Sequence, residues 1–495
     1  MRDLLIGIDV GTTGTKTLLF HKDGELIASA YRGYPLYAPN VGWSEQNAMD
    51  WWHAIVETVR EVCCADGLAA RVAAISLSTQ GGTFVPVDSA GAPLRPAIVW
   101  SDQRAVAQRD AYLREVGDDD SIYQKTGWHL GTAMLAVVIR WMRDNEPELF
   151  AKTAQFLSVP DFVSLYMTGI AAADLSNLGN DQLCDIRSET YDETILEFDG
   201  ITTQQLPRIL HSGDVIGHLT KQAAEEMGLD TEVVLVAGAH DQYAVALGAG
   251  VSNAGDIMIG SGTCWVITSI ADEADFESGL AQSVAAVPGK WGSICSLSSG
   301  GVCLDWLRKN IACDTDGTPL DYGCINDLAA KKSAAADGLF FYPFSGKRNA
   351  DDNFIKASFV GLDLSHDRYD MARAVMEGVA FQVAWMMEDF KAKPSAAGIK
   401  LAGGASKSPL WCQIVADVTG YPVRIPAVAD LACVGAAIMA GTGCGIYSDT
   451  ADGYAHLCVS DRVVMPDPDR AKAYRPLLEQ YKVQAELLWP TCGTH

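Results

Sequence analysis

A turn rich in glycine and threonine follows the first apolar segment of the chain. Leu4–Val10 has the composition of a buried strand, and the next residues, Gly11–Thr17, read GTTGTKT with hydroxyls at Thr12 and Thr13. Glycine lets the backbone approach a polyphosphate closely, and successive N–H groups in a turn can bind its oxygens. The spacing is not that of a Walker P-loop, so an ordinary hairpin is the other interpretation. At the strand end, Asp9 could hold Mg²⁺ through water.

The same layout recurs near the middle of the chain. Asp256–Thr268, DIMIGSGTCWVIT, is again an apolar strand, a Gly/Thr turn (Gly260–Thr263) and a second apolar strand. The preceding segment, Ala246–Gly255, is rich in small and turn-forming residues and reads as a boundary. Two related halves that each open with a strand–turn–strand unit predict a cleft between them that could hold a phosphate chain.

A carboxylate follows another buried strand. Val233–Ala237 is apolar, and Asp241 stands shortly after it, before a predicted helix. Asp241 could be the N-cap of that helix. If it lies at the junction of the two halves, it could instead accept a proton from a substrate hydroxyl during phosphoryl transfer. Its neighbour Gln242 could then hydrogen-bond a second hydroxyl.

Two further groups of residues follow predicted strands. In LAGGASKSP (Leu401–Pro409) the flat backbone at Gly403 and Gly404 either accommodates an adenine ring or allows a strand and a helix to pack tightly. In the first half, a set of polar and aromatic side chains suits a polyhydroxylated ligand, although each member could equally be a surface or packing residue. The set consists of Gln80, Trp100, Asp102 and Arg104.

The elements that must position these residues alternate between strand-like and helix-like, which predicts an α/β architecture. A chain of 495 residues is too long for a single hydrophobic core, so two or three domains are expected. A long helix is predicted over Asp367–Lys391. Another should begin with Ser408 as N-cap and Pro409 in its first turn, and a terminal docking helix should occupy Arg470–Leu488.

Charge and cysteine content limit the partners and the compartment. The 62 acidic residues exceed the 37 Lys and Arg, and the net charge of −25 disfavours nucleic acid and anionic membranes. Thirteen cysteines without a CxxC pair indicate free thiols in a reducing compartment. No run of residues resembles a signal peptide or a membrane span. We therefore expect a cytoplasmic protein.

These motifs, in this order, resemble the FGGY carbohydrate kinases from Gly7 to about Gly445. The most specific match is ASFVGLDLSHDRYDMARAVMEG (Ala357–Gly378), which fits the C-terminal signature of that family at every defined position. Further characteristic segments are GWSEQ (Gly42–Gln46), PDFVSLYMTG (Pro160–Gly169), AGAHDQ and LAGGASKSPLW. The resemblance implies two actin-like, ribonuclease-H-like ATPase domains that close on MgATP and a sugar or polyol.

The resemblance also implies domain bounds and residue roles. The N-terminal domain would span residues 1–248, the C-terminal domain 249–464, and a docking helix and tail 465–495. Asp241 would be the catalytic base, and with Asp9 it would bind the metal. Residues implied to bind ATP are Gly11, Thr12, Thr13, Lys16, Gly262, Thr263, Gly403, Gly404 and Ala405. Residues implied to contact the substrate are Gln80, Gly81, Gly82, Trp100, Asp102, Arg104, Asp241 and Gln242.

Departures from the family pattern concern the substrate. Val138 stands where the N-terminal signature expects a lysine. Xylulokinases typically have Met-His, and glycerol kinases Arg-Glu, where this chain has Gly81 and Gly82. The absence of the Arg and Glu side chains found in glycerol kinases argues against glycerol as the acceptor. Two glycines are expected to widen the pocket and to leave only backbone groups at these positions.

A pentulose such as xylulose is the expected acceptor, with similarity nearest to xylulokinase. Ribulose, a polyol such as erythritol, and gluconate remain alternatives. The expected cofactors are ATP and Mg²⁺, and a homodimer is possible. A rival from another class is an ATP-binding conformational protein related to actin or the heat-shock chaperones, which would hydrolyse ATP against water.

Overall fold

The structure is a computed structural model that describes residues 2–334, 338–344, 356–458 and 461–492. The chain divides into two compact units. The first contains Met1–Ser252, Asp272–Ser293 and Asp430–Cys458, and the second contains Asn253–Ala271, Ile294–Ala429 and Val459–His495. None of the helices among these described residues is long and apolar enough to cross a membrane.

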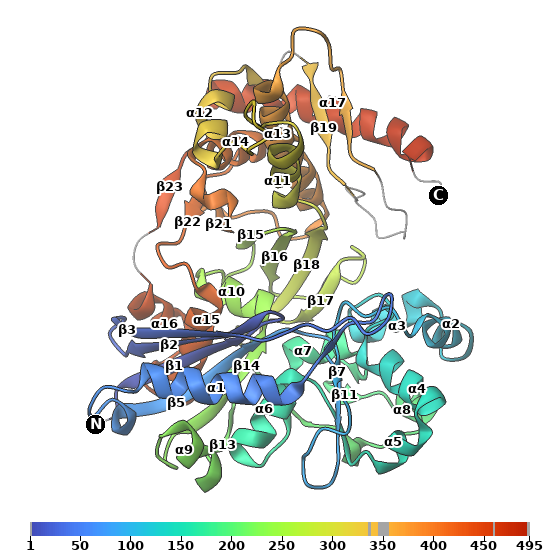
Figure 1. The fold of residues 1–495 in the computed structure, drawn as a ribbon, viewed down its shortest axis with the longest axis vertical. Helices are drawn as coiled ribbons and strands as arrows, with labels where there is room; N and C mark the ends of the chain where they lie inside the picture. The colour runs from blue at the N-terminus through green and yellow to red at the C-terminus, as the bar shows by residue number, and fades with distance from the viewer. Residues whose placement is uncertain (1, 335–337, 345–355, 459–460, 493–495) are drawn as a thin grey trace. The chain divides into compact units, whose positions relative to one another are not determined.

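The first unit is built on a six-stranded sheet of order β13-β14-β5-β1-β2-β3 (Figure 1). Its strands are β1 (Leu4–Val10), β2 (Gly14–His21), β3 (Leu26–Gly33), β5 (Val72–Thr79), β13 (Val215–His218) and β14 (Val234–His240). β1 and β2 form an antiparallel hairpin, whereas β1, β5 and β14 are parallel neighbours. The parallel strands are almost entirely buried because helices cover both faces of the sheet.

Alternate residues of β1 show how the two faces are covered. Ile6 and Ile8 share a core with Trp51 of α1 (Ala48–Val62), which packs on β2 and β3. Gly7 points the other way, and a Cβ atom there would lie only 1.9 Å from the carbonyl oxygen of Cys433. That carbonyl belongs to α15 (Leu431–Gly443), which packs on β1, β5 and β14. Glycine at position 7 therefore allows α15 to lie directly on the sheet.

Smaller elements complete the first unit. Further helices are α2 (Val106–Glu115), α3 (Asp119–Thr126), α4 (Leu135–Asn145), α5 (Pro147–Lys152), α6 (Val159–Thr168), α7 (Leu175–Asp181), α8 (Glu193–Asp199), α9 (Lys221–Met227), α10 (Asp241–Gly248) and α16 (Thr450–Leu457). Short strand pairs are β4 (Glu45–Gln46) with β7 (Ala97–Ile98), β6 (Val85–Val87) with β8 (Gln155–Leu157), β9 (Ala172–Asp174) with β12 (Arg208–Leu210), and β10 (Cys184–Asp185) with β11 (Thr190–Tyr191).

The contiguous domains 1–248 and 249–464 expected from the sequence differ from this division, because residues 430–458 pack with the first unit. The reason is a close contact between α10 and α15. A Cβ atom on Gly435 would lie 2.0 Å from the oxygen of Ala244, and one on Gly248 would lie 2.0 Å from the oxygen of Leu431. Reciprocal glycines thus bring the two helix backbones together.

This contact gives a stability prediction. Gly435→Ala should lower the free energy of unfolding by about 1–3 kcal/mol or more, because the added methyl group meets backbone and not a movable side chain. Gly33→Ala is the matched control, since its Cβ would lie at an ordinary 3.5 Å from the oxygen of Thr13. Thermal unfolding of both variants checks the prediction, and equal Tm values would contradict it.

The second unit repeats the core arrangement of the first. Its strands β16 (Trp265–Ala271), β15 (Ile257–Ser261), β21 (Ile399–Gly403) and β22 (Val423–Ile425) are neighbours in that order, followed by β23 (Arg462–Val464). β15 pairs with β16 antiparallel and with β21 parallel, and β21 pairs with β22 parallel. The order and directions match β2-β1-β5-β14, so the predicted repeat of a strand–turn–strand unit is present.

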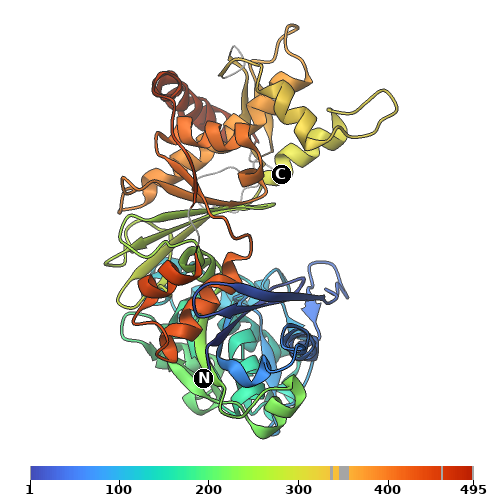
Figure 2. The same ribbon diagram turned by 90° about the vertical axis from the view of Figure 1, so that its left-hand side faces the viewer.

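The helices of the second unit agree with most of the sequence predictions. They are α11 (Gly301–Asn310), α12 (Tyr322–Ala329), α13 (Arg368–Met386), α14 (Pro409–Thr419) and α17 (Pro468–Cys492), beside a strand pair β19 (Phe340–Tyr342) and β20 (Ser358–Val360). Ser408 caps α14 by accepting a hydrogen bond from the N–H of Trp411. α17, red in Figure 2, packs on α13 and α14. Its Tyr474 hydroxyl donates to Glu377, which also accepts from Arg373.

Candidate active site

Three parallel strands of the first unit end side by side. In the register of the sheet, Asp9 of β1 lies opposite Ser78 of β5, and Ser78 lies opposite Ala239 of β14. The Ser78 hydroxyl donates a 2.8 Å hydrogen bond to Oδ1 of Asp9. Asp241 follows directly after β14. The carboxyl ends of parallel strands at one sheet edge are where α/β proteins place ligands, and here that edge carries two carboxylates.

Asp241 is the first residue of α10, and the interpretation that it caps this helix is wrong. The N-cap is His240, whose side chain accepts a hydrogen bond from the N–H of Gln242. The Asp241 carboxylate is 35% exposed, and its Oδ1 lies 3.2 Å from Nδ1 of His240. Its negative charge is favoured at the positive end of the helix dipole. The carboxylate is therefore accessible to a ligand.

The pKa of Asp9 is affected by two other carboxylates. The pKa of Asp9 is raised to about 6, chiefly by burial and also by the charges of Asp241 and Asp430, while the hydrogen bond from Ser78 acts in the opposite direction. Lys16 lowers this pKa. Lys16, predicted to bind ATP, places its Nζ 2.5 Å from Oδ1 of Asp430. Asp430 immediately precedes α15, and sequence reasoning missed it because nothing near position 430 indicates which sheet this helix covers.

The glycine–threonine turn between β1 and β2 is held by several hydrogen bonds. The Gly11 N–H donates to the oxygen of Gly14, and the Tyr34 hydroxyl donates to the oxygen of Gly11. The carbonyl of Thr12 accepts a 2.6 Å bond from Nε2 of Gln46. Thr13 is exposed at the tip. A turn held in this way presents its backbone in one fixed conformation, as phosphate binding requires.

The same turn is bonded to residues predicted to contact the substrate. The Thr12 hydroxyl donates to Oε1 of Gln80, and Nε1 of Trp100 donates to the Thr12 hydroxyl, both at 2.9 Å. Nε2 of Gln80 donates in turn to Gln46. Trp100 is 54% exposed, so its ring offers a large apolar surface beside the turn. The structure therefore brings the predicted phosphate turn and two predicted substrate residues together, and it adds Gln46 to them.

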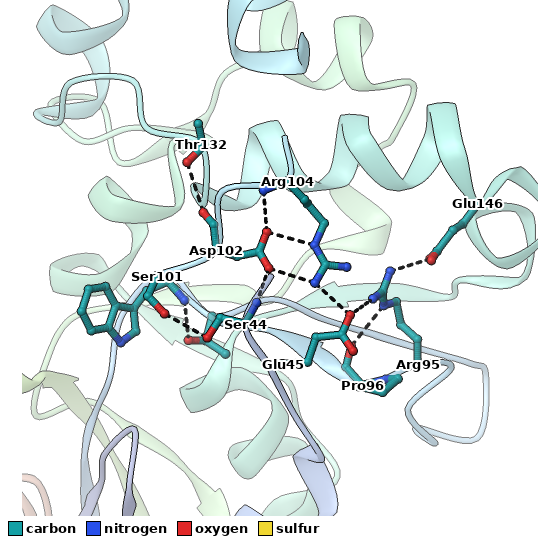
Figure 3. A network of polar contacts seen from close by, with 11 residues as sticks. Ser44, Glu45, Arg95, Pro96, Ser101, Asp102, Arg104, Thr132 and Glu146 are labelled. Carbon is teal, nitrogen blue, oxygen red and sulfur yellow. Dashed lines mark hydrogen bonds and ion pairs between the residues drawn. The ribbon is translucent and has the colours of Figure 1, made fainter. Parts of the chain in front are cut away.

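Asp102 and Arg104 lie in a buried network, shown in Figure 3. The Arg104 guanidinium donates to both carboxylate oxygens of Asp102 and pairs with Glu45 at 2.8 Å. Oδ2 of Asp102 also accepts from the Ser44 N–H. The Arg104 guanidinium stacks 3.7 Å over the ring of Trp43. The Asp102 carboxylate and the Nε and Nη2 atoms of Arg104 are thus bonded within the protein, whereas the buried Nη1 of Arg104 has no hydrogen-bond partner among the described residues.

This burial corrects the prediction that Asp102 and Arg104 contact the substrate. Their side chains are 0% and 1% exposed, so neither reaches a ligand in this structure. The WSDQR segment does contain an accessible residue, Trp100, but Asp102 and Arg104 turn inward, where they pair with each other and Arg104 also pairs with Glu45. Asp102 and Arg104 would therefore affect a ligand only indirectly, by fixing the loop that carries Trp100.

The expectation that Gly81 and Gly82 widen a pocket is also wrong at Gly81. A Cβ atom on Gly81 would lie 2.4 Å from Cδ2 of His240 and 2.6 Å from Nδ2 of Asn180. The space that a side chain at position 81 would need is thus filled by an imidazole and an amide. Neither His240 nor Asn180 was predicted, because their relation to Gly81 depends on contacts between residues far apart in the sequence.

In the second unit the two other predicted ATP segments meet at the ends of β15 and β21. Ser261 lies opposite Gly403 in the register, and the N–H of Gly404 donates to the Ser261 oxygen. The N–H of Ala405 donates to the Ser261 hydroxyl at 3.1 Å. Gly403 has φ +99°, and a Cβ atom there would lie 2.8 Å from the Ser261 backbone. Glycine at position 403 is therefore required by both conformation and space.

The second predicted ATP-binding segment of this unit is the turn after β15, at Gly262 and Thr263. The carbonyls of Gly262 and Thr263 accept hydrogen bonds from the N–H groups of Gly301 and Gly300, at 3.1 and 3.0 Å. Gly262 and Thr263 are both exposed. A fixed, exposed turn beside a flat glycine segment has the character expected of a phosphate and adenine surface.

The carboxylates at the strand ends are compatible with Mg²⁺. Among the described residues, no three His, Cys, Asp or Glu side chains are arranged to hold a metal ion by themselves. Mg²⁺ in phosphoryl-transfer sites takes one or two protein carboxylates and completes its shell with phosphate oxygens and water. The raised pKa of Asp9, with Asp241 and Asp430 contributing, marks a place where a cation would relieve repulsion.

Comparison with known proteins agrees with this geometry. Residues 4–248 match the N-terminal domain, and residues 255–444 the C-terminal domain, of the FGGY family of carbohydrate kinases. The chain belongs to this family, with its two-domain, actin-like ATPase fold, and is a phosphotransferase with an alcohol group as acceptor.

Individual relatives are similar along their whole length. Gluconokinase of Bacillus subtilis is 27% identical, with 97% of this chain and 94% of that protein covered. Xylulose kinase of the same organism is 28% identical, with 97% and 96% covered. The crystal structure of xylulose kinase from Rhodospirillum rubrum has a TM-score of 0.90 and 28% identity, with 99% of both chains covered.

Proposed function

We propose that this carbohydrate kinase transfers the γ-phosphoryl group of ATP to a primary hydroxyl of a small open-chain sugar, with a pentulose such as xylulose as the acceptor. The observation that carries the proposal is the edge formed by β1, β5 and β14. There the accessible carboxylate of Asp241 stands at the same sheet edge as Asp9, and the turn between β1 and β2 is bonded to Gln80 and Trp100.

Asp241 acts as general base in this proposal. As the acceptor oxygen bonds to phosphorus and the bond to ADP breaks, the hydroxyl proton passes to the Asp241 carboxylate. The exposed face of Trp100 supports the carbon chain of the sugar, and Gln242 hydrogen-bonds a further hydroxyl. Mg²⁺, when bound near Asp9 and Asp241, would neutralise charge on the phosphates. The turn at Gly11–Thr13 contacts the phosphates, with the N–H groups of Thr12 and Thr13 as donors, because the Gly11 N–H is already bonded to the oxygen of Gly14.

Two segments of the second unit are also proposed to contact ATP. The turn at Gly262 and Thr263 contacts the phosphates, and the flat segment Gly403–Ala405 lies by the adenine. Support comes from the repeat of strand order between the two units, which gives both turns the same relation to their sheets.

Local charge favours a ketose over an aldonate such as gluconate. The carboxylates of Asp241 and Asp430 are near enough to Asp9 that their charges raise its pKa. The nearby cation, Lys16, is already paired with Asp430. A carboxylate-bearing acceptor would add a negative charge to this group, whereas a neutral pentulose does not.

The test is ADP formation in a coupled assay with pentuloses, pentitols, tetritols and aldonates as acceptors. We expect ADP to form only when an acceptor is present, fastest with a pentulose, and in equal amount to the sugar phosphate found by mass spectrometry. ADP formation at the same rate without any sugar would favour the actin-like or chaperone-like class and refute the proposal.

A further inference from the structure

The GWSEQ segment (Gly42–Gln46) lies between the glycine–threonine turn and the loop that carries Trp100. Its last residue, Gln46, ends the short strand β4 and is 1% exposed. Nε2 of Gln46 donates to the carbonyl of Thr12 at 2.6 Å. Oε1 of Gln46 accepts from Nε1 of Trp51 at 3.3 Å and from Nε2 of Gln80 at 3.0 Å. One buried side chain therefore connects the turn between β1 and β2 to Gln80.

The partners fix the direction of each hydrogen bond in this group. A carbonyl can only accept and an indole N–H can only donate, so the amide of Gln46 has a single orientation. Because Oε1 of Gln46 accepts from the Gln80 nitrogen, the Gln80 oxygen is left to accept from the Thr12 hydroxyl. That hydroxyl accepts in turn from Nε1 of Trp100. Gln46, Gln80 and the two polar groups of Thr12 thus form a closed ring, to which Trp100 is attached.

The other residues of the GWSEQ segment hold the loop of Trp100. The carbonyl of Ser44 accepts from the N–H of Val99 at 2.9 Å, and the carbonyl of Gly42 accepts from the N–H of Gln103 at 2.8 Å. The Ser101 hydroxyl donates to the Ser44 hydroxyl at 3.0 Å (Figure 3). The segment is therefore bonded to the loop on both sides of Trp100 and, through Gln46, to the turn.

The ring and the groups attached to it differ in exposure. Gln46 and Gln80 are 1% and 3% exposed, whereas Trp100 is 54% exposed and Thr13 is exposed at the tip of the turn. Breaking the hydrogen bonds of buried amides is costly, because it leaves polar groups without partners. The ring is therefore the rigid part, and the exposed indole and turn tip are the parts that a ligand would order.

We propose that this ring couples the binding of ATP to the binding of the acceptor, with Gln46 as a positioning residue and the Thr12 hydroxyl as the shared group. The inference rests on the proposed function, in which the turn contacts the phosphates and Trp100 supports the sugar. Phosphates restrict Thr12 through its backbone, and a sugar restricts it through the indole that donates to its hydroxyl. The first ligand thereby supplies part of the ordering that the second requires, so each binds more tightly in the presence of the other.

The main test compares Thr12→Val with Thr12→Ser. Valine keeps the shape of the side chain and the backbone N–H but removes the hydroxyl, whereas serine keeps the hydroxyl. Calorimetry measures the Kd of xylulose, or of the acceptor that the ADP assay identifies, with and without a non-hydrolysable ATP analogue and Mg²⁺. The wild type and Thr12→Ser should bind the sugar roughly 5- to 150-fold more tightly with the analogue, the usual range of coupling. Thr12→Val should bind it nearly equally in both conditions, and wild-type coupling in Thr12→Val would overturn the proposal.

Gln46→Ala removes the positioning side chain itself. This variant should also lose the coupling, and it should raise KM for both substrates while kcat changes little, because Asp241 is untouched. Gln108→Ala is the matched control, since Gln108 is 9% exposed and its Nε2 bonds to Asp144 at 3.1 Å. The control should keep the coupling of the wild type. Equal loss of coupling in both variants would contradict a specific role for Gln46.

Hydrogen exchange examines the same link without catalysis. Sugar alone should slow amide exchange in the wild-type peptide that covers Gly11–Lys16, because it fixes Trp100 and hence Thr12. Thr12→Val should show no such protection at saturating sugar, and equal protection in both proteins would refute the link. If the wild type forms ADP with no acceptor at all, the proposed function fails. If the wild type is active but its coupling survives in Thr12→Val, the present inference alone fails.

Discussion

Asp241→Asn is expected to lower kcat for the sugar by roughly 10²- to 10⁴-fold, the usual contribution of a general base. The amide has nearly the same size as the carboxylate but cannot accept the hydroxyl proton. Helix α10 should be unaffected, because its N-cap is His240 and not Asp241. The dissociation constant for ATP should therefore change by only a few fold, as measured by calorimetry on the same protein sample.

Glu193→Gln is the matched control for this variant. Glu193 is also an acidic residue in the first position of a short helix, α8, and it is exposed. Its replacement removes the same charge from the same kind of helix terminus, away from the strand ends that carry Asp9 and Asp241. Activity of the control should equal that of the wild type. A comparable loss in both variants would attribute the effect to helix electrostatics and not to proton transfer.

Asp102→Ala is expected to cost about 3–5 kcal/mol of folding free energy, because it leaves a buried arginine without its main partner. Arg104 is 1% exposed and donates two hydrogen bonds to this carboxylate. Its remaining ion pair with Glu45 places the expected loss toward the lower end of that range. Urea denaturation of the purified variant measures the change.

The control for this second variant is Asp110→Ala. Asp110 pairs with Arg109 at 3.1 Å, but the pair is 28% and 46% exposed. Surface pairs of this kind contribute roughly 0–1 kcal/mol. If Asp102→Ala proves as stable as Asp110→Ala, and loses only affinity for the sugar, then Asp102 contacts the substrate after all and its buried position here is not the functional one.

Much of the fold follows from patterns that are local in the sequence. The strand–turn–strand units at residues 4–20 and 256–268 show themselves by apolar runs around Gly/Thr turns, and the structure gives both the same place in equivalent sheets. The start of α14 was predictable as well, since Ser408 and Pro409 are cap and first-turn residues whose preference depends only on their neighbours.

Features that depend on distant partners were not predictable. Whether Asp102 faces a ligand or the interior depends on Ser44, whose N–H donates to it, and on Glu45, which pairs with Arg104; no local pattern connects either residue to Asp102. Helix α15 is apolar on all sides, so its sequence marks it as buried without indicating which sheet it covers. His240 stood beside a predicted catalytic residue, but its relation to Gly81 exists only in the folded chain.

The most direct test of the catalytic assignment is a single-turnover experiment with enzyme in excess over radiolabelled ATP and with saturating sugar. Rapid quenching then follows the chemical step itself, apart from product release. The assignment predicts rapid formation of labelled sugar phosphate by the wild type, and formation slowed by at least about 10²-fold by Asp241→Asn with ATP still bound. Sugar phosphate formed by Asp241→Asn at a rate near that of the wild type would show that another group takes the proton.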